Sequence, residues 1–147
     1  MLSARRDHVR RTIEPALTDG RWVLCDRFHD STVAYQGYGG GVPLHDIATL
    51  YRIAVGDLKP ALTIILDLPV EQGLQRARIR QEANPSPFVE DRFERMGTGF
   101  HERLRAAFLD IAHNEPERCA VIDARPDETA VHQAIVAAVS QRLGVAL

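Results

Sequence analysis

The stretch DRFHDSTVAYQGYGGG, residues 26–41, opens with an acid and a base side by side. The pair Asp26 and Arg27 follows the apolar run 22–25, which predicts a strand over about residues 21–25 with the pair at its carboxyl end. In open α/β sheets, ligands bind at that edge. The guanidinium of Arg27 is a planar fork that matches two phosphate oxygens, and the carboxylate of Asp26 could orient that fork or approach a magnesium ion. From Asp-Arg alone, a surface salt bridge remains the alternative.

The residues that follow supply groups for holding a small polar molecule. Ser31 and Thr32 bring hydroxyls, Tyr35 brings a flat ring with a polar tip, and Gln36 brings an amide that both donates and accepts hydrogen bonds. A few polar groups beside an aromatic face are typical of ligand pockets. Together with the Asp-Arg pair they suggest a site for a nucleoside that carries phosphate.

These residues need a scaffold, which the hydrophobic pattern outlines. Apolar residues at helical spacing predict helices over 3–18, about 43–55, 70–82, about 95–113 and 127–143, and apolar runs predict further strands over 62–66 and 119–122. The segment 83–90, with two prolines, predicts a loop. Alternating helices and strands predict an α/β fold, a mainly parallel sheet with helices on both faces, in one domain over 1–147.

Each predicted strand is followed by an aspartate: Asp26, Asp67 and Asp123. For Asp67 and Asp123 the simpler interpretation is a helix cap or a solvated turn, because an aspartate that follows a strand often serves as one or the other. Asp26 differs because it is joined to Arg27 and to the polar stretch beyond it.

Composition narrows the class of protein. The chain has 147 residues and a formal charge of −2, which argues against a nucleic-acid-binding protein. No segment has the apolar length of a membrane span or a signal peptide. Cys25 and Cys119 lie in predicted strands without metal-ligand spacing, so we expect buried, reduced thiols and a cytoplasmic location. The six histidines show no ligand spacing either, which predicts no metal site built on them.

The stretch 26–41 resembles the motif of the thymidylate kinase family, in which a strand ends in Asp-Arg-aromatic and runs on to Ser-x-x-Ala-Tyr-Gln-Gly. Similarity continues through SARRDHVRRTIEPALTDGRWVLCDRF, GDLKPALTIILDLPVEQGLQRARIR, DRFE and VIDA, and so covers nearly the whole chain. The resemblance implies a P-loop kinase-like fold. It also implies transfer of the γ-phosphate of ATP to dTMP to give dTDP, in dTTP biosynthesis, with Mg²⁺ as the ion.

The resemblance implies roles for the residues of the acceptor side. Arg6 and Arg27 would bind the phosphate of dTMP, and Asp26 would lie near the transferring phosphoryl group and its magnesium ion. Ser31 and Thr32 would lie along the thymine.

Two further residues would complete that pocket. Tyr35 would crowd the 2′ position and so favour deoxyribose, and Gln36 would help to close the pocket. The partners implied are the small molecules dTMP and ATP, with no nucleic acid and no membrane, and a homodimer as the complete form.

A lid over ATP is implied for about residues 76–94. Arg80 matches the arginine that bacterial members of the Escherichia type place there, Arg76 and Arg78 flank it, and Arg92 of DRFE lies at the far end. For Arg76 and Arg78, the solvated face of a helix remains an alternative.

The chain departs from the family pattern in several places. It contains no G-x-x-x-x-G-K-[ST] sequence, and its only lysine, Lys59, precedes a proline. We therefore expect a fold without the P-loop strand-loop-helix unit and doubtful activity for the chain alone. Leu2, Gly40 and Ala61 replace a phenylalanine, an arginine and an aspartate of the family pattern.

Two alternative functions remain open. One is a truncated, non-catalytic remnant that binds nucleotide or a partner. The other is a kinase for another deoxynucleoside or its monophosphate.

Overall fold

The computed structural model describes residues 2–83 and 96–146, with the side chain of Leu2 left out. The chain divides into two compact units, Met1–Lys59 and Pro60–Leu147. Whether the two units form one domain stays a prediction. Within the described ranges no helix has the length and apolar character needed to cross a membrane.

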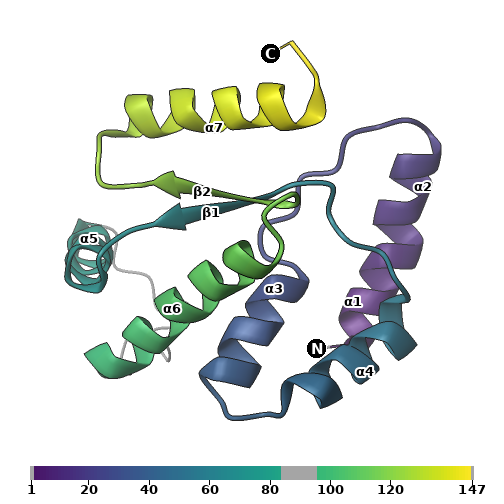
Figure 1. The fold of residues 1–147 in the computed structure, drawn as a ribbon, viewed down its shortest axis with the longest axis horizontal. Coiled ribbons are helices and arrows are strands. Elements are labelled where there is room, and N and C mark those ends of the chain that lie inside the picture. The colour runs from purple at the N-terminus through teal and green to yellow at the C-terminus, as the bar shows by residue number, and fades with distance from the viewer. Residues whose placement is uncertain (1, 84–95, 147) are drawn as a thin grey trace. The chain divides into compact units, whose positions relative to one another are not determined.

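The first unit is helical wherever the structure assigns an element. One continuous helical run comprises α1 (Leu2–His8), the π-helical segment η1 (Val9–Ile13) and α2 (Glu14–Thr18), which confirms the helix predicted over 3–18. A second run comprises α3 (His29–Thr32) and the π-helical segment η2 (Val33–Tyr38), and α4 (Leu44–Val55) follows it (Figure 1). Hydrophobic periodicity did not predict the run 29–38, where polar residues and glycine interrupt the apolar pattern.

The core of this unit joins the three helical runs. Val9, Ile13, Phe28 and Tyr51 are buried together, and the rings of Phe28 and Tyr51 meet edge to face with centroids 6.0 Å apart. The hydroxyl of Tyr51 donates a hydrogen bond to the carbonyl of Leu58. Phe28, at the start of α3, is thereby held between the first helix and α4.

The strand predicted over 21–25 is wrong. These residues form no regular element, and the side chains of Trp22 and Leu24 are 59% and 91% exposed. A strand needs a neighbour to pair its backbone groups, and nothing in the described part of the first unit pairs with this segment. Cys25 is consequently exposed rather than buried, whereas Cys119 is buried as expected, and both are free thiols.

The second unit contains a parallel strand pair with helices on both sides. Strands β1 (Thr63–Asp67) and β2 (Cys119–Asp123) pair in a register from Thr63↔Cys119 to Asp67↔Asp123. Helices α6 (Thr98–Asn114) and α7 (Glu128–Leu143) lie on opposite sides of the pair, and α5 (Val70–Ala83) lies beyond its carboxyl end (Figure 1). The parallel α/β fold class is confirmed, and these elements agree with the predicted ones to within about three residues.

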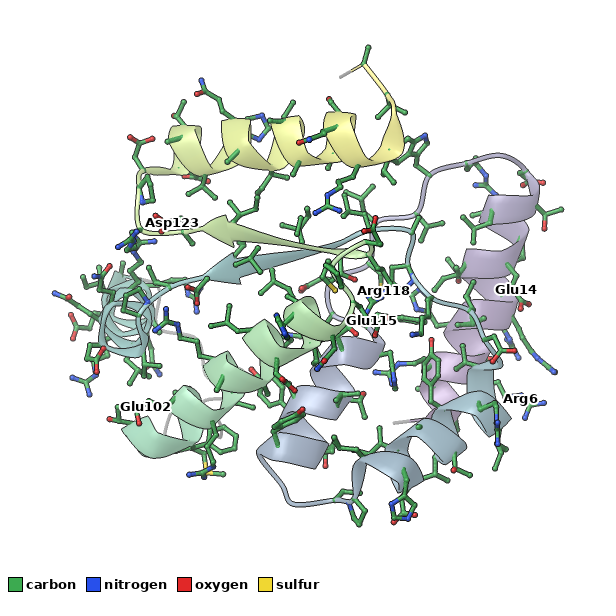
Figure 2. All side chains as sticks on the ribbon, viewed as in Figure 1. Arg6, Glu14, Glu102, Glu115, Arg118 and Asp123 are labelled. Carbon is green, nitrogen blue, oxygen red and sulfur yellow. The ribbon has the colours of Figure 1, made fainter. Side chains whose placement is uncertain are left out.

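Buried apolar residues from α6 and the strands form the core of this unit, chiefly Ile65, Leu104, Ala107, Ile111 and Ile122. Arg118 fixes the amino ends of the two strands. Its Nη1 donates to Thr63 Oγ1 at 2.7 Å, and its Nε and Nη2 donate to the carboxylate of Glu115 at 3.0 and 3.1 Å. Figure 2 shows Glu115 and Arg118 close together near the start of β2. Most of the predicted loop 83–90 falls outside the described residues.

Candidate functional site

Arg27 has an unusual backbone conformation. Its φ is +63°, and it is the only residue other than glycine with a positive φ in the described ranges. The left-handed region costs an L-residue with a Cβ roughly 1–2 kcal/mol. Such strain is often found at functional sites, where the surrounding structure holds it in place.

The side chain of Arg27 lies over the ring of Tyr35, with Cζ 5.3 Å from the ring centroid. This cation–π contact joins the residue after Asp26 to the π-helical segment η2. Arg27 is exposed, so its guanidinium is accessible to a ligand. The contact with the Tyr35 ring limits the orientations that the guanidinium can adopt. The fold thus places two of the predicted acceptor residues, Arg27 and Tyr35, in contact with each other.

Buried polar atoms near Phe28 and η2 include Oγ1 of Thr32, a residue that is only 7% exposed, and Nη1 of Arg5. Neither of these atoms has a hydrogen-bond partner among the described residues. Arg5 also donates from Nη2 to the carbonyl of Phe28 at 3.2 Å, and its Cζ lies 5.5 Å from the Phe28 ring centroid. Buried polar groups are usually satisfied, so each of these atoms is available to a bound polar molecule.

Arg5, rather than the predicted Arg6, is the arginine that contacts this region. Arg6 is exposed, and Figure 2 shows it at the outer side of the first unit, away from α3. Helical spacing alone does not separate the two arginines. Arg5 precedes the buried Val9 by four residues and Arg6 precedes it by three, and both spacings place a side chain on the same side of a helix. The phosphate role of Arg6 stays a prediction.

The remaining predicted acceptor residues lie on the helical run 29–38 or, for Asp26, in the segment that leads into it. Ser31 is half-buried, and Gln36 and Asp26 are exposed. The carbonyl of Gln36 accepts a hydrogen bond from the amide of Val42 at 2.9 Å, which closes the turn after η2. At Gly40, the family position of an arginine, a Cβ would come within 2.8 Å of that carbonyl, so this turn requires glycine as it is built.

In the second unit, charged residues gather at the carboxyl ends of the strands. Arg105 of α6 holds the carboxylate of Asp67 with two hydrogen bonds, Nε to Oδ1 at 2.7 Å and Nη2 to Oδ2 at 2.8 Å. These hydrogen bonds lower the pKa of Asp67. The carboxylate is therefore ionised and engaged in linking β1 to α6.

Asp123, the register partner of Asp67, is held by its own neighbour. The side chain and backbone amide of Arg125 donate to it, and these bonds lower the pKa of Asp123 to about 2. Figure 2 places Asp123 at the tip of β2. The simpler interpretation of this acid, a turn at the strand end, agrees with these bonds.

The arginines predicted for the lid differ in their surroundings. Arg76 donates from Nη1 to the carbonyl of Ala124 and from Nη2 to that of Arg125, both at 2.9 Å. Arg78 and Arg80 are exposed on α5. Arg92 lies outside the described residues, as does most of the predicted lid, so the lid stays a prediction.

A solved structure identifies the class of protein. The crystal structure of thymidylate kinase from Ehrlichia chaffeensis matches with a TM-score of 0.69 and 32% sequence identity, over 95% of this chain and 60% of that one. The parallel strands flanked by helices therefore belong to the P-loop kinase-like α/β fold.

Sequence comparisons define the family within that class. The family model "Thymidylate kinase" matches residues 1–135. The curated thymidylate kinase of Caulobacter vibrioides is 54% identical over 145 residues, which are 99% of this chain and 66% of that protein. The thymidylate kinase of Rhodopseudomonas palustris strain TIE-1 is 52% identical over 96% of this chain and 60% of its own length. The chain belongs to the thymidylate kinase family and spans about three fifths to two thirds of these relatives' length.

Proposed function

We propose that this chain carries the acceptor side of an enzyme that transfers the γ-phosphate of ATP to dTMP. The observation that carries the proposal is the arrangement around Arg27. This residue has a strained backbone, and its guanidinium lies over the ring of Tyr35. The helical run that carries Tyr35 also carries Thr32, whose buried hydroxyl has no hydrogen-bond partner among the described residues. Family membership supplies the reaction, and these residues supply groups that such a reaction needs.

In this mechanism the residues position and stabilise rather than form covalent bonds. Phosphoryl transfer depends mainly on in-line placement of the reacting groups and on neutralising their charge. Arg27 would hold the acceptor phosphate with its planar fork, and its strained backbone would fix where that fork points. Tyr35, Ser31, Thr32 and Gln36 would hold the nucleoside.

We include Arg5 in the acceptor site. It reaches the carbonyl of Phe28 and keeps a buried N–H without a partner among the described residues, whereas Arg6 is exposed. On the donor side we propose Arg80 as a cation that approaches the transferring phosphate, because it is exposed near the end of α5.

A Mg²⁺ ion could serve this reaction while bound by only one or two side chains of the protein. Within the described residues no three His, Cys, Asp or Glu side chains are grouped so that they could hold a metal. Mg²⁺ in phosphate-transfer sites commonly uses one or two carboxylates, several waters and the substrate's phosphates. The exposed carboxylate of Asp26 suits that role, and the ion would neutralise charge on the phosphates of ATP. A homodimer and a cytoplasmic location are further proposals that rest on the family.

The test is a kinase assay on a chimera in which this chain replaces the matching 145-residue segment of the Caulobacter enzyme. We expect ATP-dependent conversion of dTMP to dTDP.

Arg27→Ala should lower kcat/KM for dTMP by roughly tenfold to a hundredfold, as for loss of a hydrogen bond between charged groups. The matched control is Arg11→Ala, which removes only an exposed pair with Asp7. A folded chimera without turnover would refute the proposed reaction, and an unchanged kcat/KM in Arg27→Ala would refute the role of Arg27.

A further inference from the structure

The bonds of Arg76 join two elements that are far apart in the sequence. Arg76 lies in the middle of α5, and its two carbonyl partners, Ala124 and Arg125, follow β2 directly. The planar guanidinium makes this possible because its two Nη atoms diverge toward two consecutive peptide carbonyls. A lysine ammonium at this position has no such fork.

The same loop is tied to β1. The amide of Ala124 donates to the carbonyl of Asp67 at 2.8 Å, and the carboxylate of Asp67 is held by Arg105 of α6. A continuous chain of hydrogen bonds therefore runs from α6 through Asp67 and Ala124 to Arg76 on α5. It lies at the carboxyl edge of the strands, the edge at which α/β proteins bind ligands.

Arg80 lies close to this connection on α5. It follows Arg76 by four residues and so lies one turn further along the same face of α5, about 6 Å along the helix axis. Arg76 is exposed, so its substitution removes little buried surface. The geometry makes Arg76 better suited to orienting α5 than to binding phosphate, because two of its N–H groups already serve carbonyls.

We propose that Arg76 is a positioning residue: by bonding the carbonyls of Ala124 and Arg125, it fixes the part of α5 that carries Arg80 relative to the loop after β2. This inference rests on the proposed phosphotransfer function. It assigns Arg76 a role distinct from the predicted contact with ATP. In this role Arg76 affects the rate of phosphoryl transfer and not the binding of dTMP.

The first measurement concerns the connection itself, in the 147-residue chain. We expect Arg76→Ala to increase hydrogen exchange at the amides of Ala124 and Arg125 by about three- to tenfold, measured by NMR, with a smaller increase in Arg76→Lys. The control is Gln75→Ala, an exposed neighbour on the same helix. Unchanged exchange in Arg76→Ala would overturn the proposal.

The second measurement concerns the rate, in the chimeric enzyme. Arg76→Ala should lower kcat by about tenfold to a hundredfold, the range expected when catalytic groups are misplaced by about 1 Å, with KM for dTMP within about twofold of wild type. Arg76→Lys should recover part of kcat and would remain informative if Arg76→Ala did not fold. Faster exchange with normal kcat, or a raised KM for dTMP with normal kcat, would overturn the positioning role. Absence of turnover in a folded, unsubstituted chimera would instead refute the proposed function, and the positioning role with it, whatever the exchange showed.

Discussion

Arg27 combines a side chain suited to phosphate with a backbone conformation that opposes folding. At φ +63° the strain arises from the Cβ, which alanine retains and glycine lacks. We expect Arg27→Gly to be more stable than Arg27→Ala by about 1 kcal/mol, measured by urea unfolding. Equal free energies of unfolding for the two variants would show that the left-handed conformation carries no strain at this position.

The contrast between Arg5 and Arg6 shows what a motif match leaves out. Both are arginines at the start of the first helix, and the resemblance selected Arg6. In the structure it is Arg5 that contacts Phe28, and spacing from the buried Val9 does not predict this because both arginines lie within one turn of it. The side-chain bonds of Arg76 could not be predicted either, since its partners lie 48 and 49 residues away and depend on the tertiary fold.

The carboxylate of Asp123 makes stability depend on pH in the acid range. Hydrogen bonds from Arg125 lower its pKa from 3.8 to about 2, so the folded state binds this proton less readily than the unfolded chain. The contribution is complete above about pH 4 and is lost as pH falls toward 2. Its size is modest because both side chains are exposed.

The measurement is thermal unfolding between pH 7 and pH 2. Asp123→Asn should show a smaller fall in melting temperature below pH 4 than the unsubstituted chain. Arg125→Gln should behave similarly, because it removes the cause of the lowered pKa. Superimposable pH profiles for all three proteins would exclude the stabilising role of this pair.

At the level of elements, periodicity predicted the helices well and the strands less well. The first helix, α4 and α6 agree with the apolar spacing because each buries apolar residues along one face. Helices α5 and α7 also form where they were predicted, although α5 buries only Val70 and α7 buries none of its residues. The segment 21–25 has the composition of a strand but no partner in the described residues, and strand formation depends on the partner. The run 29–38 is helical although its sequence is rich in polar residues and glycine.

Gly37 and Gly73 are both helical glycines in different surroundings. A Cβ at Gly37 would lie 2.5 Å from Leu44 Cδ2 and 3.2 Å from Ile47 Cδ1, whereas a Cβ at Gly73 would lie 3.7 Å from Leu68 Cδ2, an ordinary van der Waals distance. We expect Gly37→Leu to destabilise the chain by about 1–3 kcal/mol through overpacking against α4. We expect Gly73→Ala to stabilise it by roughly 0.5–1 kcal/mol through helix propensity.

Chemical denaturation of both variants tests these values. Gly73→Ala is the matched control, since it adds a side chain to a helical glycine without crowding. A stabilised Gly37→Leu variant would mean that η2 and α4 are not packed as closely as the structure indicates.

At the scale of the whole molecule, the sequence predicts the order of elements better than their packing. The parallel pairing of β1 and β2 follows from the helices between and after them, because parallel strands require a crossover. The bonds of Asp67 to Arg105 and of Arg118 to Thr63 do not follow from it, because they join residues 38 and 55 positions apart. The proposed acceptor residues from Asp26 to Gln36 lie near one another in the chain because they are contiguous, and their role stays a prediction.

Because the proposed acceptor residues are contiguous, dTMP binding can be tested on the 147-residue chain itself. A ligand that binds only the folded state stabilises it by RT ln(1 + [L]/Kd), or about 2.7 kcal/mol at a hundred times Kd. We therefore expect dTMP to raise the melting temperature by several degrees, with smaller shifts from thymidine, which lacks the phosphate, and from dCMP. Arg27→Ala should bring the dTMP shift down to that of thymidine, because the variant no longer distinguishes the phosphate. Equal shifts by dTMP in Arg27→Ala and the unsubstituted chain would place the phosphate elsewhere, and a larger shift with dCMP would change the proposed substrate.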